Sequence, residues 1–277
     1  MSISYEIITS RANPTVKWAA SLKEKKQREC ENAFLAEGIK LTVEAIRAGL
    51  EVTHVFVTES KKDRFLPLIE EAIESVNNKS CRIILANEGV IEKISTEKAP
   101  DGAISVIKYL DFFKRTDIIY KEEFLLGEDS RAIVLCSVAD PSNLGSVIRS
   151  AVAFGAEHII LTGDTADIYN PKTVRSAMGS LFRIKCTRVS SFESLADYLH
   201  SKGRRLYAAE LRPGAKSLSL VNLSQKDLFV IGNEGHGIPE DISRLCDGSV
   251  YIPISSKTES LNASVAAAVF MWEQSKL

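Results

Sequence analysis

The chain has 277 residues, 45% of them hydrophobic, and a formal net charge of −1. These values allow a full core in one or two domains, and they exclude a disordered chain and a generally basic nucleic-acid binder. No run of about 18 apolar residues and no signal-peptide pattern occurs, so we expect a cytoplasmic protein with no membrane segment. The five cysteines are widely spaced, which predicts reduced, mostly buried thiols and no metal site.

The N-terminal part alternates between helical and β-rich patterns. An Asn-Pro start at Asn13 predicts a basic helix that runs to about Cys30. The patterns then predict strands at 34–35, 52–58, 81–86 and 103–109, and helices at 39–48 and 61–76. The charged, weakly periodic segment 111–130 is expected to link a domain at 1–110 to a second domain at 131–277.

A basic stretch between Arg11 and Arg28 is the best candidate for contact with a polyanion. It holds six basic residues: Arg11, Lys17, Lys23, Lys25, Lys26 and Arg28. Such a cluster can neutralise phosphates, although a solvated helix face explains it equally well.

The C-terminal part predicts a parallel sheet covered by helices on both faces. β-rich segments lie at 132–138, 158–161, 184–189, 205–211, 228–231 and 250–254, and helical patterns separate most of them. Parallel neighbours need such long crossovers, so this part belongs to the α/β class. Three loops after these strands stand out, because open α/β sheets bind ligands at the carboxyl ends of their strands.

The first loop, 140–149, opens a helix. Its apolar positions recur at helical spacing: Leu144, Val147, Ile148, Ala151 and Val152. Arg149 lies off this stripe and could be a site residue or a surface charge. Asn143 is expected at the N-cap, a role that alone could explain it.

The second loop, 232–239, holds three glycines in six residues, which lets a ligand approach the backbone closely. A plain turn is the alternative. The GxGxxG spacing of dinucleotide sites is missing, which disfavours a nicotinamide-dependent oxidoreductase. His236 is expected to face solvent rather than to act as a base.

The third loop, 251–264, leads into an alanine-rich terminal helix. Ser260 or Asn262 could cap this helix, and its buried face is expected to include Val265, Val269 and Trp272. The four histidines form no metal-binding pattern, and neither a serine elbow nor a P-loop occurs.

In this order and spacing, the three loops resemble the SPOUT superfamily, in its SpoU/TrmH branch of RNA ribose methyltransferases. The segments that carry the resemblance are 143–149, 175–179, 232–238, 252–254 and 260–264. Segments 13–17 and 34–38 are similar to the family's N-terminal RNA-binding domain, which has an L30e-like α/β fold. Departures occur at Ser150, Val152 and 255–257, and they leave the fine specificity open.

The resemblance implies an S-adenosylmethionine-dependent homodimer with a deep trefoil knot, although knots are rare among proteins. It implies catalytic roles for Asn143, Arg149, Glu234, Ser260 and Asn262. The implied cofactor-binding residues are Ala209, Glu210, Leu211, Gly232, Asn233, Gly235, Ile252, Leu261, Asn262 and Ser264. The implied RNA-binding residues are Asn13, Lys17, Lys25, Arg28 and Arg175, with no metal.

The expected activity is 2′-O-methylation of RNA, with large-subunit (23S) ribosomal RNA as the first choice and transfer RNA as the second. Arginine is a poor base because it stays protonated, so Arg149 is expected to grip the phosphate beside the target ribose. A noncatalytic, ribosome-associated RNA-binding protein is the alternative of another class.

Overall fold

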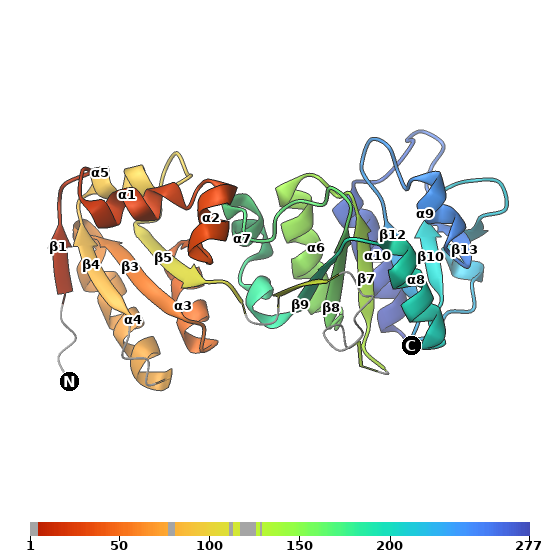
Figure 1. Cartoon of the computed structure of the whole chain (residues 1–277), viewed down its shortest axis with the longest axis horizontal. Coiled ribbons are helices and arrows are strands. Elements are labelled where there is room, and N and C mark those ends of the chain that lie inside the picture. The colour runs from red at the N-terminus through yellow and green to blue at the C-terminus, as the bar shows by residue number, and fades with distance from the viewer. Residues whose placement is uncertain (1–4, 77–80, 111–112, 117–125, 128) are drawn as a thin grey trace. The chain divides into compact units, whose positions relative to one another are not determined.

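The structure is a computed structural model that describes residues 5–76, 81–110, 113–116, 126–127 and 129–277. The chain forms two compact units (Figure 1). Unit 1 comprises Met1–Leu110 with Tyr169–Phe182, and unit 2 comprises Asp111–Ile168 with Arg183–Leu277. The sequence did not indicate that segment 169–182, from the C-terminal half, would join unit 1.

Unit 1 is a five-stranded sheet between two pairs of helices (Figure 1). In spatial order its strands are β1 (Tyr5–Ile8), β4 (Arg82–Ala86), β3 (Val52–Thr58), β5 (Ala103–Lys108) and β2 (Ala33–Glu37). Only β5 runs antiparallel to its neighbours. One face carries α1 (Pro14–Ser21) and α5 (Glu88–Ile94), and the other carries α3 (Ile39–Arg47) and α4 (Lys62–Val76).

The expected basic helix to Cys30 is wrong, because the chain breaks into α1 and α2 (Lys25–Glu31). Arg28 explains the break: its Nη1 atom donates to the carbonyl oxygens of Leu22 and Lys23, at 3.0 and 2.6 Å. These bonds hold the connection between the helices and leave Arg28 only 2% exposed. The edge strand β1 went unnoticed because three of its four residues are exposed.

Segment 169–182 is held in unit 1 by an aromatic cluster. Tyr169 is fully buried and stacks on Tyr109, with ring centroids 4.0 Å apart, and it also contacts Phe34 at 4.7 Å. Its hydroxyl accepts a hydrogen bond from the backbone N–H of Leu110. The helix that follows, α7 (Pro171–Ala177), packs against β2 and precedes the 3₁₀ turn η2 (Ser180–Arg183). Burial of Tyr169 therefore stabilises this attachment.

Unit 2 has an eight-stranded sheet whose pairings are all parallel. In spatial order its strands are β11 (Lys216–Ser217), β13 (Gly248–Tyr251), β10 (Leu206–Ala209), β12 (Leu228–Ile231), β7 (Ala132–Cys136), β8 (His158–Thr162), β9 (Lys185–Val189) and β6 (Phe113–Thr116). One face carries α8 (Phe192–Ser201) and α9 (Glu240–Arg244), and the other carries α6 (Pro141–Ala153) and α10 (Ala263–Ser275). The central strands are buried throughout, as strands covered on both faces must be.

Three expectations for unit 2 are wrong. Segment 113–116 of the expected linker forms β6, and most of the rest of the linker lies outside the described residues. The last strand ends at Tyr251, because Pro253 has no N–H for a sheet ladder. The predicted buried face of α10 is largely exposed, with Val265 at 48% and Trp272 at 52%. Because α10 is apolar on nearly every side, its periodicity could not select the buried face.

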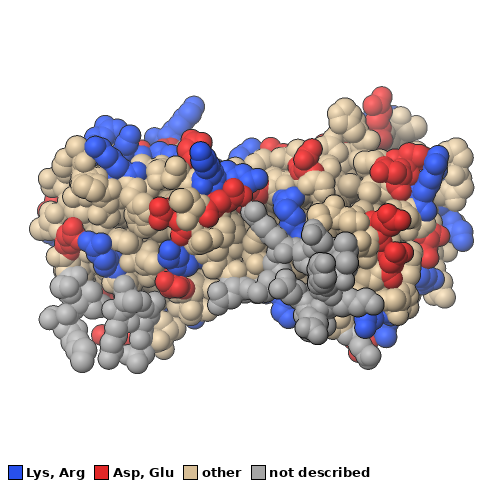
Figure 2. All heavy atoms as spheres, viewed as in Figure 1, with Lys and Arg blue, Asp and Glu red and all other residues tan. Residues whose placement is uncertain are grey.

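Charged side chains are spread over both units (Figure 2). Lys and Arg gather along the edge of unit 1 where Figure 1 draws α1 and α2. None of the helices in the described part of the chain has the length and apolar character needed to cross a membrane.

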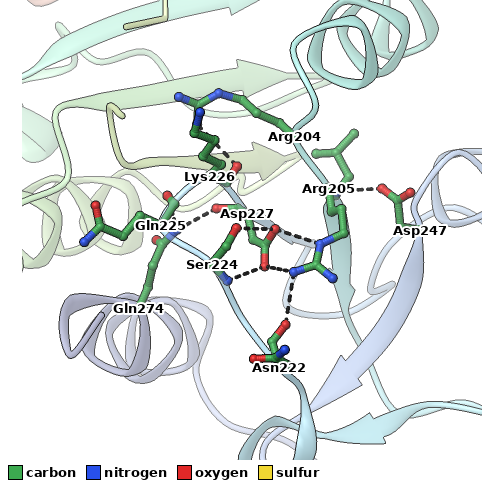
Figure 3. Close-up of polar contacts among 10 residues, drawn as sticks. Arg204, Arg205, Asn222, Ser224, Gln225, Lys226, Asp227, Asp247 and Gln274 are labelled. Carbon is green, nitrogen blue, oxygen red and sulfur yellow. Dashed lines mark hydrogen bonds and ion pairs between the residues drawn. The ribbon is translucent and has the colours of Figure 1, made fainter. Parts of the chain in front are cut away.

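A group of polar contacts around Asp227 ties the end of α10 to the start of β12 (Figure 3). Asp227, whose side chain is 2% exposed, accepts bonds of 2.9 and 2.7 Å from the guanidinium of Arg205. Ser224 donates to the same carboxylate through its backbone N–H and its hydroxyl. The amide of Gln274 donates to the backbone oxygens of Asp227 and Gln225. These bonds fix the C-terminal end of α10 and the N-terminal end of β12, opposite the loops that follow β12 and precede α10.

Candidate active site

A cavity of about 510 Å³ lies at the carboxyl ends of β10, β12 and β13. Eight of the ten residues expected to bind a cofactor line it: Ala209, Glu210, Leu211, Gly232, Asn233, Gly235, Ile252 and Leu261. Asn262 and Ser264 lie beside it without lining it. The cavity therefore stands where open parallel sheets bind their ligands.

The glycine-rich loop after β12 folds back on itself. Asn233 and Gly237 exchange two backbone hydrogen bonds of 3.0 and 2.9 Å, and Gly237 has a φ of +68°. The Asn233 side chain accepts bonds from the N–H groups of Gly235 and His236, and it donates to the carbonyl oxygen of Ser137. A side chain at Gly232 would lie 2.5 Å from the backbone of Gly237, so glycine is required there.

The side chain of Asn143 joins the three loops. Its Nδ2 donates to Oε1 of Glu234 at 2.6 Å, and its Oδ1 accepts from Nδ2 of Asn262 at 2.9 Å. Asn143 lies in the first turn of α6, Glu234 in the loop after β12, and Asn262 at the start of α10. The expected N-cap role of Asn143 is wrong: Asp140 caps α6 by accepting from the N–H groups of Ser142 and Asn143. The Asn143 side chain is therefore free of a capping role and can bond to both Glu234 and Asn262.

The third loop reaches the site through Asn262. Its Oδ1 accepts hydrogen bonds from the backbone N–H groups of Ser264 and Val265 and from the Ser264 hydroxyl, so Asn262 caps α10. Its Nδ2 donates to Oδ1 of Asn143. The single residue Asn262 therefore both caps α10 and connects the third loop to Asn143. Ser260 lines the cavity.

Arg149 is the one expected catalytic residue that the structure does not bring to this cluster. It is exposed and does not line the cavity. It follows Asn143 by six residues on α6, about 9 Å further along the helix axis. Within one chain, Arg149 therefore lies away from the hydrogen-bonded group of Asn143, Glu234 and Asn262.

Sequence reasoning did not find the hydrogen-bond network on the floor of the cavity. Oε1 of Glu210 accepts from the hydroxyls of Ser243 and Ser249, at 2.5 and 2.7 Å, and pairs with Arg212 at 3.3 Å. Its carboxylate raises the pKa of Arg212, chiefly by hydrogen bonding. Ser243 and Ser249 lie in segments without a motif, so only the folded chain reveals the network.

The five expected RNA-binding residues differ in their surroundings. Lys17 and Lys25 are exposed, while Asn13 caps α1 by accepting from the N–H of Thr15. Arg175 forms an ion pair with Glu97. Arg28 contradicts the expectation, because its buried guanidinium is bonded to backbone carbonyls and cannot reach a phosphate. Exposed lysines of α1 and α2 thus remain as a basic surface (Figure 2).

The described residues contain no group of three or more potential metal ligands. Among the cysteines, Cys136 and Cys186 are buried, Cys81 and Cys246 are half-buried, and Cys30 is exposed, so the expectation of mostly buried thiols holds in part. Burial raises the pKa of Cys186 to about 12, which makes it a poor nucleophile. His236 lies exposed at the cavity wall.

An apolar hollow of about 380 Å³ lies on the outer side of α6 and α10. Its walls are Ser150, Phe154, Ser264, Val265, Ala268, Val269 and Trp272. The rings of Phe154 and Trp272 lie 5.7 Å apart, and half of the Trp272 side-chain surface faces outward. An exposed apolar surface of this kind is typical of an interaction site.

Comparisons with known proteins agree with these observations. The model of the SpoU rRNA Methylase family matches residues 130–272, and that of the MRM3-like substrate binding domain matches residues 13–105. The chain is 29% identical over 265 residues to the 23S rRNA (guanosine(2553)-2′-O)-methyltransferase RlmP of Bacillus subtilis, covering 96% of this chain and 97% of the relative. It is also 29% identical to the 23S rRNA (uridine(2479)-2′-O)-methyltransferase of Streptomyces viridochromogenes, with coverages of 96% and 90%.

A solved structure has the same fold along the whole chain. The AdoMet-bound rRNA methyltransferase from Sinorhizobium meliloti superimposes with a TM-score of 0.84 at 27% identity, over 98% of each chain. Both units of the present chain therefore have counterparts in that structure.

Gly232→Ala is expected to destabilise the protein by about 2 kcal/mol or more, because the added methyl group would collide with the backbone of Gly237. Gly235→Ala is the matched control: its methyl group would meet Asn233 Oδ1 at an acceptable 3.6 Å. Urea unfolding should separate the two variants. Equal stabilities would contradict the close approach at Gly232.

Proposed function

This chain belongs to the SpoU rRNA methylase family, and we propose that it transfers a methyl group from S-adenosylmethionine to a ribose 2′-hydroxyl of RNA. One observation carries the proposal. Asn143 links three separate loops at the edge of a cavity lined by the residues expected to bind the cofactor.

The cavity fits S-adenosylmethionine in size and in character. Its wall combines apolar residues such as Leu211, Ile231 and Phe270 with the glycine-rich loop 232–237. Leu211 is 78% exposed at the wall and offers an apolar surface to a flat base. When bound, the cofactor supplies an electrophilic methyl group on a positively charged sulfur.

The residues around the cavity would orient the acceptor. Glu234 and Asn262 are held by Asn143, so their positions are set before RNA arrives.

Arg149 stays protonated and would grip the RNA phosphate beside the target ribose. In that position it stabilises the forming alkoxide, and a phosphate oxygen accepts the hydroxyl proton.

Large-subunit ribosomal RNA is the proposed substrate, because two relatives similar to nearly the whole chain are named 23S rRNA 2′-O-methyltransferases. The N-terminal unit, which matches a substrate-binding domain model, would select the RNA. The test is to offer labelled cofactor with separate ribosomal and transfer RNA pools. Label in transfer RNA alone would contradict this choice.

We also infer that the enzyme is a homodimer through the apolar hollow of α6 and α10. The hollow includes Ser150, the neighbour of Arg149, so pairing there would carry Arg149 to the interface. Arg149, which lies outside the cavity of its own chain, could then serve the cavity of the partner. The trefoil knot of the family remains a prediction.

Arg149→Ala is expected to lower methyl transfer about 100-fold or more, because a charge stabilising the transition state is lost. Cofactor affinity should change little, since Arg149 does not line the cavity. A radiolabelled methyl-transfer assay measures the first effect and calorimetry the second. Arg244→Ala, which removes a 74% exposed arginine of α9, is the control. Near-normal turnover of Arg149→Ala would contradict its role.

Replacing Lys17, Lys25 and Lys26 together with alanine should weaken RNA binding and flatten its dependence on salt, because fewer counterions are released. All three are exposed on α1 and α2. The measurement is the RNA dissociation constant at several salt concentrations. Replacement of Lys62, Lys202 and Lys276 is the control for lost charge. If both triple variants gave the wild-type slope, this surface would not bind RNA.

Trp272→Glu should yield a monomer, because a charge placed in the apolar hollow cannot be buried without a large desolvation cost. Sedimentation velocity gives the mass, and the methyl-transfer assay should fall in parallel if Arg149 acts across the pair. Lys202→Glu, at the end of α8 on the opposite face of the sheet, is the control. A dimeric Trp272→Glu protein would rule out this interface.

A further inference from the structure

The cavity wall has an uneven distribution of charge. It contains three carboxylates, those of Glu210, Glu234 and Glu259, and neither lysine nor arginine is among the described residues that line it. The chain as a whole is nearly neutral, so this local excess of negative charge does not follow from its composition.

Two of the three carboxylates are engaged by neighbouring side chains. Glu210 pairs with Arg212 and accepts from two serine hydroxyls, so its charge is balanced and its position is fixed. Glu234 accepts from the Asn143 amide. In the part of the chain that the structure describes, Glu259 makes neither a hydrogen bond nor an ion pair through its carboxylate. Both oxygens of Glu259 are therefore open to a ligand in the cavity, whereas the Glu234 carboxylate is held by the neutral Asn143 amide and the Glu210 carboxylate is paired with Arg212.

In the proposed function the cavity binds two ligands in turn, the methyl donor and the product left after transfer. These two ligands differ in charge at the sulfur atom. The donor carries a sulfonium, and loss of its methyl group to the acceptor leaves a thioether that is neutral at sulfur and unchanged in the rest of the molecule. A carboxylate in the cavity wall attracts the first form more strongly than the second. Apolar packing and backbone contacts, in contrast, act on both forms alike.

We propose that Glu259 makes the cavity selective for the cationic methyl donor over the neutral product. The inference rests on the proposed function and adds a specificity-determining residue to it. The preference eases the exchange of spent product for fresh donor, since both compete for the same cavity. Because Glu259 is exposed, the expected effect is that of a solvent-accessible charge pair, about fivefold in affinity.

The experiment is calorimetric titration of the full-length protein with three ligands. These are S-adenosylmethionine, S-adenosylhomocysteine, and sinefungin, which has an ammonium group where the donor has its sulfonium. Glu259→Gln keeps the shape of the side chain and removes its charge. Glu273→Gln is the matched control, because it removes a carboxylate from α10 that does not line the cavity.

Glu259→Gln is expected to weaken binding of the two cationic ligands about fivefold and to leave S-adenosylhomocysteine unchanged. Glu273→Gln should change none of the three affinities. Equal weakening of all three ligands by Glu259→Gln, or no weakening of any, would overturn the inference while leaving the proposed function intact. Failure of the wild-type protein to bind any of the three ligands would overturn both.

A second measurement needs no variant. Salt screens an exposed charge pair, so the wild-type preference for S-adenosylmethionine over S-adenosylhomocysteine should shrink between low and high ionic strength. A preference that is independent of salt would count against Glu259, because apolar and backbone contacts do not weaken in this way.

Discussion

The candidate site depends on a single amide side chain that donates to one loop and accepts from another. A carboxamide can do both, whereas an aspartate at position 143 could only accept. Asn143 therefore suits a place between the carboxylate of Glu234 and the amide of Asn262. These partners lie 91 and 119 residues further along the chain, so their meeting is a property of the fold.

The parallel sheet makes this meeting possible. Its central strands direct their following loops to one edge, and α6 and α10 begin at that same edge. At the other end of these elements, the Gln274 amide fixes α10 to the backbone of Asp227, just before β12, and the Asp227 carboxylate holds Arg205, just before β10. Because both ends are anchored, the loops around the cavity can hold their positions before a ligand binds.

Much of this architecture could be predicted from the sequence, because its signals are local. Alternating patterns predicted the α/β class, and the resemblance to the SpoU/TrmH family implied eight residues that line the cavity. Three features could not be predicted. The break at Arg28 depends on a buried guanidinium, the attachment of Tyr169 to unit 1 depends on distant aromatic rings, and the exposed face of α10 depends on which apolar side meets the sheet. Each is decided by tertiary packing, which periodicity does not record.

Asn143 and Glu234 are expected to act as one unit in methyl transfer. A double-mutant cycle with Asn143→Ala, Glu234→Ala and the combined variant, measured as kcat/KM for methyl transfer to RNA, tests it most directly. We expect a coupling free energy of about 1 kcal/mol or more, with the double variant little worse than either single one. Losses that add to within about 0.3 kcal/mol would contradict it, because the two side chains would then act independently.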